Sequence, residues 1–265
     1  MNRIVRSIWT GSISFGMIGV PVKLYTATEE KDISFNQVHA GECGARIKQL
    51  RWCPTEERAV EWGEIAKGYE YAKDEYIQLT EGDLAQLPTP GKELVQLVSF
   101  VPLDEVDPVF FNKSYYLGPG KAGDKAFTLL QRALEDKGLA GVATIAIRNK
   151  EKPCLVRASG GALYLDTLYY PDEIREAEFQ ADGNIAVDEK ELQLTEELIG
   201  LLEGHWAPEE FTDNYREQLL SLIDHKLDGT EIPQVQAVPV NAAADMQKML
   251  ADAVEKVKRE KSLAA

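Results

Sequence analysis

The sequence has few of the residues and patterns on which secreted and membrane proteins depend. Its 265 residues include only 3 cysteines, too few for a disulfide framework, which favours reduced thiols in the cytoplasm. No apolar run reaches the length of a membrane span, and the N-terminus lacks the continuous apolar core of a signal peptide, because a strand-like pattern follows Arg3 and Arg6 at once. We therefore expect a cytoplasmic protein without a membrane partner.

Motifs for catalysis and for cofactors are also missing. The sequence contains no GxxxxGK[ST] phosphate loop, no GxGxxG after a strand and no GxSxG nucleophile elbow. His39, Cys43 and Cys53 are the one grouping that suggests a metal, but a zinc site normally pairs its ligands at short spacing and has a fourth. We therefore expect no catalytic residue, no metal site and no cofactor, and interpret the two cysteines as structural or relict residues.

Negative charge dominates the chain but is unevenly distributed. The net charge is −15, and residues 160–240 carry 19 Asp and Glu against 4 Lys and Arg. Residues 1–60 and 111–159 instead have an excess of Lys and Arg. Because charges are screened over about 8 Å in physiological salt, two basic blocks on an acidic chain can still bind phosphate. The same blocks are equally compatible with a solvated surface, and charge alone does not decide between the two interpretations.

The apolar pattern predicts strands in the first 175 residues and helices after them. Strands are expected at residues 11–26, 69–79, 94–101, 108–117, 141–148, 154–158 and 162–170. Helices are expected at Thr80–Leu87 with Thr80 as N-cap, at 121–137, at 188–204, from Pro208 to Leu227 and after Asn241. Short strands at this spacing are typical of a barrel. We therefore predict an α+β fold dominated by an antiparallel β-barrel, followed by a C-terminal helical arm.

One stretch fits neither pattern. Residues 41–68 contain two of the three cysteines, two of the four tryptophans and a run of positive charge at Arg46, Lys48 and Arg51, without sustained periodicity. A long, basic segment between regular strands is usually functional. We therefore expect this segment to be an inserted arm that contacts a ligand.

Other cations lie on or beside the predicted strands. We expect Lys23, Lys113 and Arg148 on strands, on the side away from the apolar positions, and Lys150 and Lys152 in the turn after Arg148. Such residues on several strands of one barrel would form a cradle for a phosphate backbone. The sequence shows no recognition helix, aromatic RNA-binding strand or zinc-finger spacing, so readout of bases is not indicated.

Several long blocks of the sequence, in this order, resemble the bacterial Ku proteins of non-homologous end joining, and the resemblance covers nearly the whole chain. They are RSIWTGSISFGMIGVPVKLYTATEEKDISFNQVH (Arg6–His39), CGARIKQLRWCP (Cys43–Pro54), KGYEYAKDEYIQLTEGDL (Lys67–Leu84), PLDEVDPVFFNKSYYLGP (Pro102–Pro119) and LYLDTLYYPDEIR (Leu163–Arg175). The resemblance implies the following domains: a Ku barrel core over 1–185 with a bridge insertion over about 38–71, a helical dimerisation arm over 186–229, and a linker and C-terminal helix over 230–265.

The resemblance also implies a function. Two copies would form a ring-shaped homodimer that is closed by the two insertions, and a double-stranded DNA end would thread through the ring. The C-terminal tail would recruit a multifunctional ATP-dependent DNA ligase for double-strand break repair, in association with the nucleoid. The expected DNA-binding residues are Lys23, Arg46, Lys48, Arg51, Lys113, Arg148, Lys150 and Lys152.

Two other interpretations stay open. The chain could be an acidic protein-interaction scaffold that does not bind DNA. It could also have a minor abasic-site lyase activity through a Schiff-base lysine, although no lysine lies in an apolar stretch that would lower its pKa.

The chain also departs from some Ku relatives at its C-terminus. Those relatives have a long Lys-rich tail, whereas this chain has only a short basic cluster of Lys256, Lys258, Arg259 and Lys261.

Overall fold

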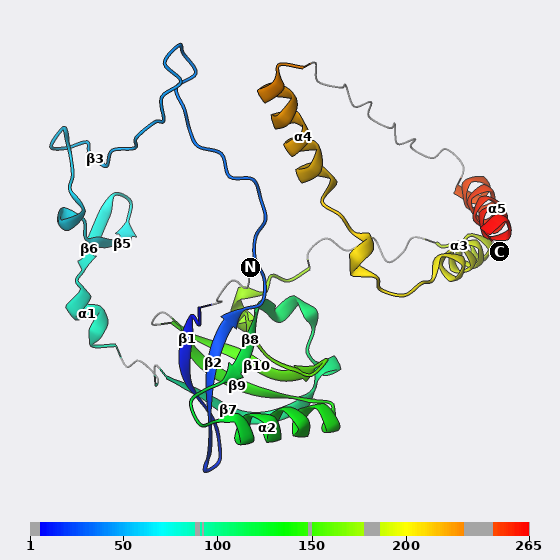
Figure 1. Ribbon diagram of the computed structural model, residues 1–265, viewed down its shortest axis with the longest axis horizontal. Coiled ribbons are helices and arrows are strands. Elements are labelled where there is room, and N and C mark those ends of the chain that lie inside the picture. Colours follow the sequence, from blue (N-terminus) through cyan, green and yellow to red (C-terminus); the bar gives the residue numbers. More distant parts are fainter. Residues whose placement is uncertain are drawn as a thin grey trace. The chain divides into compact units, whose positions relative to one another are not determined.

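The computed structural model describes residues 6–87, 91, 93–147, 150–177, 186–230 and 246–264 of the chain. The chain divides into two compact units, Met1–Glu176 and Ala177–Ala265. The first unit contains a closed β-barrel, and the described part of the second unit is helical (Figure 1).

Seven strands form the barrel. In their order around it they are β1 (Trp9–Phe15), β2 (Ile18–Thr26), β8 (Phe111–Pro119), β11 (Ala162–Leu168), β10 (Lys150–Ser159), β9 (Leu139–Ile147) and β7 (Leu94–Pro102). Neighbouring strands are antiparallel except β1 and β7, whose parallel pairing closes the barrel. The predicted fold class is therefore confirmed, with one parallel pair in an otherwise antiparallel barrel.

One side of each strand fills the interior of the barrel. On β2, Val20, Val22 and Leu24 are buried while the residues between them lie on the outer wall. The other strands add Ile13, Val95, Leu97, Leu117, Ala143, Ile145, Cys154, Val156, Leu163 and Leu165 to the same cluster. Because side chains alternate along a strand, this core fixes the direction of the remaining residues on the wall.

Helix α2 (Asp124–Lys137) covers one end of the barrel (Figure 1). Its apolar residues Phe127, Leu130 and Leu134 recur at helical spacing and belong to the same buried cluster as the strands. The helix stops at Gly138, which adopts the left-handed conformation at φ 63°. The chain enters the helix close to β2, because a Cβ at Gly120 would lie 2.8 Å from the carbonyl carbon of Pro21. The helix predicted at 121–137 is thus confirmed and begins three residues later.

The segment at 69–79 differs from its prediction as a single strand. It forms a hairpin of β5 (Lys67–Ala72) and β6 (Glu75–Leu79), because Asp74 takes up the left-handed conformation at φ 62° and reverses the chain. Among the described strands, this hairpin pairs only with itself, and so does the short pair of β3 (Trp52–Cys53) and β4 (Arg58–Ala59). Helix α1 (Glu81–Ala85) follows and is capped by Thr80, as the sequence predicts.

The described part of the second unit contains α3 (Glu189–Leu202), α4 (Asn214–Asp228) and α5 (Met246–Ala264). The carboxylates of Asp188 and Asp213 cap the first two helices. Helix α4 begins later than predicted, because Pro208 opens a separate short turn, Pro208–Glu210. The predicted cap Asn241 and the predicted linker after Thr230 lie outside the described residues.

Helices α3 and α5 pack against each other. Lys258 of the C-terminal basic cluster forms an ion pair with Glu197 on α3, with 2.5 Å between Nζ and Oε1, and Arg259 pairs with Glu255. Lys258 and Arg259 are therefore already matched within the unit. None of the helices in the described part of the chain combines the length and the apolar character that a membrane span requires.

Candidate nucleic-acid interface

The first cations of the insertion lie on a short backbone hairpin. Val38 and Arg46 form an isolated antiparallel bridge, and the amide of His39 donates to the carbonyl of Ala45 at 2.8 Å. Arg46 and Lys48 are exposed. In the described part of the chain neither forms an ion pair. Their charges are therefore available to an anionic ligand.

Arg51 is fixed in a different way. Its guanidinium carbon lies 3.7 Å from the centroid of the exposed Trp62 ring, which is a cation–π contact. Stacking leaves the edge of the guanidinium free to donate hydrogen bonds. Arg51 thus offers a planar fork of donors on the surface of the insertion.

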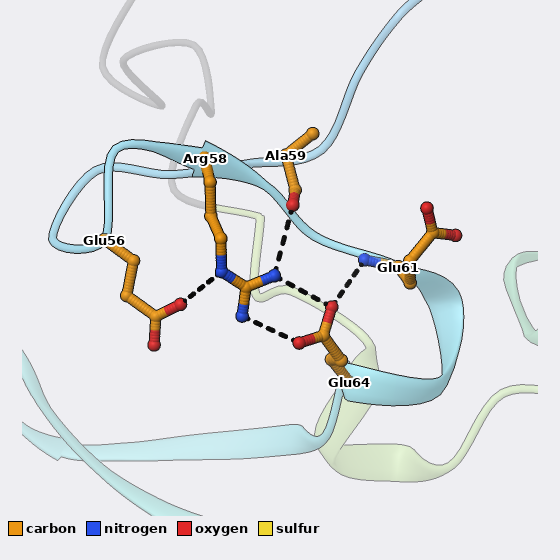
Figure 2. A network of polar contacts seen from close by, with 5 residues as sticks. All are labelled: Glu56, Arg58, Ala59, Glu61 and Glu64. Atoms are coloured by element: carbon orange, nitrogen blue, oxygen red, sulfur yellow. Dashed lines mark hydrogen bonds and ion pairs between the residues drawn. The ribbon is translucent and has the colours of Figure 1, made fainter.

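A third arginine of the insertion, Arg58, is neutralised by carboxylates (Figure 2). Arg58 donates from Nη1 and Nη2 to the two oxygens of Glu64 at 3.0 and 2.7 Å, and from Nε to Glu56 at 2.6 Å. Glu64 also accepts the backbone amide of Glu61 at 2.9 Å. The bond from Arg58 and then that from Glu61 lower the pKa of Glu64 to about 2, while the two carboxylates raise the pKa of Arg58. This arginine braces the turn after β4 and is not available to a ligand.

Replacing Arg58 by Gln should raise the pKa of Glu64 from about 2 towards its ordinary value of 4.5. A carboxyl with a lowered pKa stabilises its folded environment above the unfolded pKa, and that contribution is lost as the pH falls through the folded pKa. The wild-type turn should therefore persist to lower pH than the variant, as measured by an NMR titration of the Glu64 carboxyl. Glu56→Gln leaves the fork intact and should keep the pKa low. The same titration curve in wild type and Arg58→Gln would contradict this assignment.

Three of the predicted barrel cations gather at the end of the barrel opposite α2. Lys113 is the third residue of β8 and pairs with Thr167 on β11, which in turn pairs with Cys154 on β10. Lys150 and Lys152 precede Cys154 on β10. All three thus lie near the starts of two strands that run in the same direction on either side of β11. Arg148 lies outside the described residues.

The prediction of a turn at Lys150 and Lys152 is wrong. Lys150 pairs with Ile147 and Lys152 with Ile145, so both lie in the ladder between β9 and β10. The ladder starts before the first apolar residue of β10, because backbone hydrogen bonds need no apolar side chain. At the open end of the barrel, the charged side chains can reach solvent.

The strand register decides which way the other two lysines face. Lys23 lies between the buried residues Val22 and Leu24, so it is on the outer wall, as predicted. Lys113 has the same parity as Leu117, whose side chain is buried in the core. The prediction that Lys113 lies on the side away from the apolar positions is therefore wrong. It is exposed because it stands at the open end of the strand, beyond the core.

His39 and Cys43 lie together, with 3.2 Å between Nδ1 and Sγ. The described residues contain no group of three or more His, Cys, Asp or Glu side chains arranged for a metal ion. Cys154 lies inside the barrel, where burial and, to a lesser extent, Asp166 raise its pKa to about 12. A thiol with so high a pKa is unreactive at neutral pH, so Cys154 is a core residue.

One set of residues on the outer wall could not be recognised from the sequence. Tyr25, Tyr116, Tyr164 and Arg157 are successive cross-strand partners on β2, β8, β11 and β10. The four residues come from four separate segments of the sequence, so no local pattern marks the set. Only the order and register of the four strands bring these side chains into line. We refer to these four residues as the outer row.

Comparison with known proteins identifies the family. The family model of the Ku70/Ku80 beta-barrel domain matches residues 14–196. The chain is also 38% identical to the Non-homologous end joining protein Ku of Bacillus subtilis over 261 residues, which are 96% of this chain and 83% of the relative. The chain belongs to the Ku family. The predicted family is thus confirmed.

Two further relatives show how the length of Ku-family chains varies. The Non-homologous end joining protein Ku of Archaeoglobus fulgidus is 36% identical over 254 residues, which are 95% of this Ku-family chain and 100% of the relative. The protein of the same name from Frankia casuarinae is 38% identical over 240 residues, but these are only 60% of that relative. The residues matched by the Ku70/Ku80 beta-barrel family model include the cations of the insertion and those at the open end of the barrel.

Proposed function

We propose that this protein binds the ends of double-stranded DNA without regard to sequence and acts in non-homologous end joining. The observation that carries the proposal is a pair of exposed cations, Arg46 and Lys48, that form no ion pair within the described residues and lie in the insertion of a Ku-family chain. Relatives of this chain bear the name Non-homologous end joining protein Ku. Lys113, Lys150 and Lys152 give the barrel a second basic group, and Lys23, Arg51 and Arg148 complete the proposed set of DNA-binding residues.

We propose further that two copies form a ring. The hairpin of β5 and β6 leaves Tyr69, Tyr76 and Ile77 each more than half exposed. A hairpin of two strands is marginally stable in water unless an apolar face is covered. A second copy of the insertion would supply that cover, so that the two insertions close a ring around the duplex.

A closed ring selects DNA ends by topology. It cannot be loaded onto uninterrupted DNA, so it needs no contacts with bases to distinguish an end from an internal site. Lys and Arg contacts with phosphates release counterions, so the affinity should fall steeply with salt. None of these steps requires bond making by this chain, and the ligation chemistry would belong to a partner enzyme.

The helical unit supplies surfaces for such partners. Leu192, Ile199 and Leu202 on α3 are exposed, and exposed apolar residues in groups are typical of interaction sites. We propose that this unit contributes to the dimer and that the C-terminal segment with α5 recruits a multifunctional ATP-dependent DNA ligase.

A competition between two forms of one DNA molecule tests the proposal. A covalently closed minicircle and the same minicircle cut once compete against a labelled blunt duplex, with the mass of the protein measured in the same buffer. We expect the cut form to compete and the closed form to compete far less, with the mass of a dimer. Equal competition by the two forms would contradict the ring. Failure of both forms and of the labelled duplex to bind would instead favour a protein-interaction scaffold.

A further inference from the structure

The outer row brings an arginine and three tyrosines together on the wall of the barrel. Tyr25 stands opposite Tyr116, Tyr164 follows on the next strand, and Arg157 on the strand after that. Directly paired residues of antiparallel strands point to the same face. The alternate residues Leu24, Leu117 and Leu163 are in the core, so the outer row faces away from it.

Arg157 is held in place from two sides. Its Nε donates to Oδ2 of Asp166 at 2.5 Å, and its guanidinium carbon lies 4.4 Å from the centroid of the Tyr164 ring. The Tyr164 ring lies beside that of Tyr116, with 5.1 Å between the centroids. One fixed edge and one stacked face together leave the guanidinium little freedom to rotate.

Asp166 is buried beneath this arginine. The carboxylate is 1% exposed, and its second oxygen, Oδ1, has no hydrogen-bond partner among the described residues. A buried carboxylate without a counter-ion is strongly unfavourable, so Arg157 cannot swing away without leaving an uncompensated charge. Asp166 therefore anchors the arginine to the wall.

The geometry of this ion pair involves only one of the three nitrogens of the Arg157 guanidinium. An arginine that only neutralises a carboxylate commonly forms two parallel hydrogen bonds with both oxygens. Here a single bond from Nε is made, and no hydrogen bond from Nη1 or Nη2 is found within the described part of the chain. The side chain of Arg157 remains 23% exposed. Its four Nη hydrogens are thus free for an acceptor outside the barrel.

The charges around the outer row favour an anionic acceptor. Lys23 lies on the same outer face, two residues before Tyr25. Among the outward positions of β2, β8, β11 and β10, the acidic residues are Asp166, which is already paired, and Glu151. Glu151 lies six residues before Arg157, about 20 Å away along the strand. Tyr116, which lies on the other side of Tyr164 from Arg157, is exposed and adds a hydroxyl to the same face.

We propose that Arg157 binds a phosphate diester of the DNA backbone through its two Nη groups, with the hydroxyl of Tyr116 as a further donor on the same face. A planar guanidinium fork matches two oxygens of one phosphate. This inference rests on the proposed function and adds to it a binding residue on the barrel wall. Asp166 then acts as a positioning residue, because it touches the arginine and not the DNA.

The double variant Arg157→Gln with Asp166→Asn tests this proposal at constant net charge. It removes the phosphate donor and the buried carboxylate together, so no charge is left unpaired. Binding to a blunt duplex, measured over a range of salt concentrations, should weaken about tenfold or more. The slope of log affinity against log salt should fall by about 0.9 for each lost phosphate contact. Arg132→Gln with Asp136→Asn, which makes the same changes on exposed residues of α2, should bind as the wild type does.

Four outcomes of this experiment would contradict the proposal or the function on which it rests. Wild-type affinity and slope in the folded double variant would overturn the proposal while leaving the proposed function intact. A change in the mass of the protein from dimer to monomer would also overturn it, because the outer row would then be an interface between copies. Should thermal melting show the double variant to be unfolded, Arg157→Lys keeps a counter-ion for Asp166 but loses the fork, and unchanged affinity there would overturn the proposal. Absence of duplex binding by the wild type would instead refute the proposed function.

Discussion

Charge reversal of Arg46 and Lys48 to Glu should weaken binding to a blunt duplex by about 100-fold or more at physiological salt. Each charge-assisted hydrogen bond contributes about 1.5–3 kcal/mol, and two are lost in each copy. Both side chains are exposed, and neither forms an ion pair in the described part of the chain, so folding should not change. Fluorescence anisotropy over a range of salt concentrations measures the effect.

The salt dependence of the DNA affinity distinguishes the loss of direct phosphate contacts from a general change in the electrostatic potential of the protein. Loss of two phosphate contacts should lower the slope of log affinity against log salt by roughly 2 for each copy. Lys121→Glu with Lys125→Glu changes the net charge equally near α2, outside the proposed interface, and should alter the affinity much less. An unchanged slope in the Arg46 and Lys48 variant would show that the insertion does not face DNA.

Leu165→Ala should lower the free energy of unfolding of the barrel by about 2–5 kcal/mol. Leu165 is fully buried on β11, between Tyr115 on β8 and Val156 on β10. Removing its side chain leaves a cavity at the strand that supports both the open-end lysines and the outer row. Urea unfolding followed by tryptophan fluorescence measures the loss, since Trp9 packs against the same core.

A leucine on the surface provides the comparison. Leu129→Ala on α2 removes a side chain that is 60% exposed, and substitutions at such sites usually change the stability by about 0.5 kcal/mol or less. Equal losses in the two variants would mean that the barrel interior does not determine the stability of this unit. In buffer without urea, wherever the two variants are folded, both should still bind a blunt DNA duplex.

Elements with local signals could be predicted from the sequence. The cap at Thr80 and the stop of α2 at Gly138 depend on side chains a few residues apart, and the apolar alternation of β2 shows directly which way Lys23 faces. In each case the chemistry that fixes the structure lies within one or two turns of the chain. The fold class and part of the proposed interface follow from such signals.

Pairing over long distances in the sequence could not be predicted in this way. The outer row exists because β8, β11 and β10 are neighbours in one register, and Arg157 shows no sign of its partner Asp166 in its own segment. Lys150 and Lys152 were misplaced for a related reason, because a ladder set by β9 extends the strand beyond its apolar residues. Barrel closure determines all of these features.

The closing seam of the barrel joins Ser12 on β1 to Leu94 on β7, so the insertion is an excursion between two strands that flank β1. For a flexible loop, each doubling of length adds only about 0.6 kcal/mol to the entropic cost of closure. Insertions and deletions within this excursion can therefore accumulate over evolution with little penalty to the barrel. In a ring closed by two such excursions, the bore could change among homologues while the scaffold stays the same.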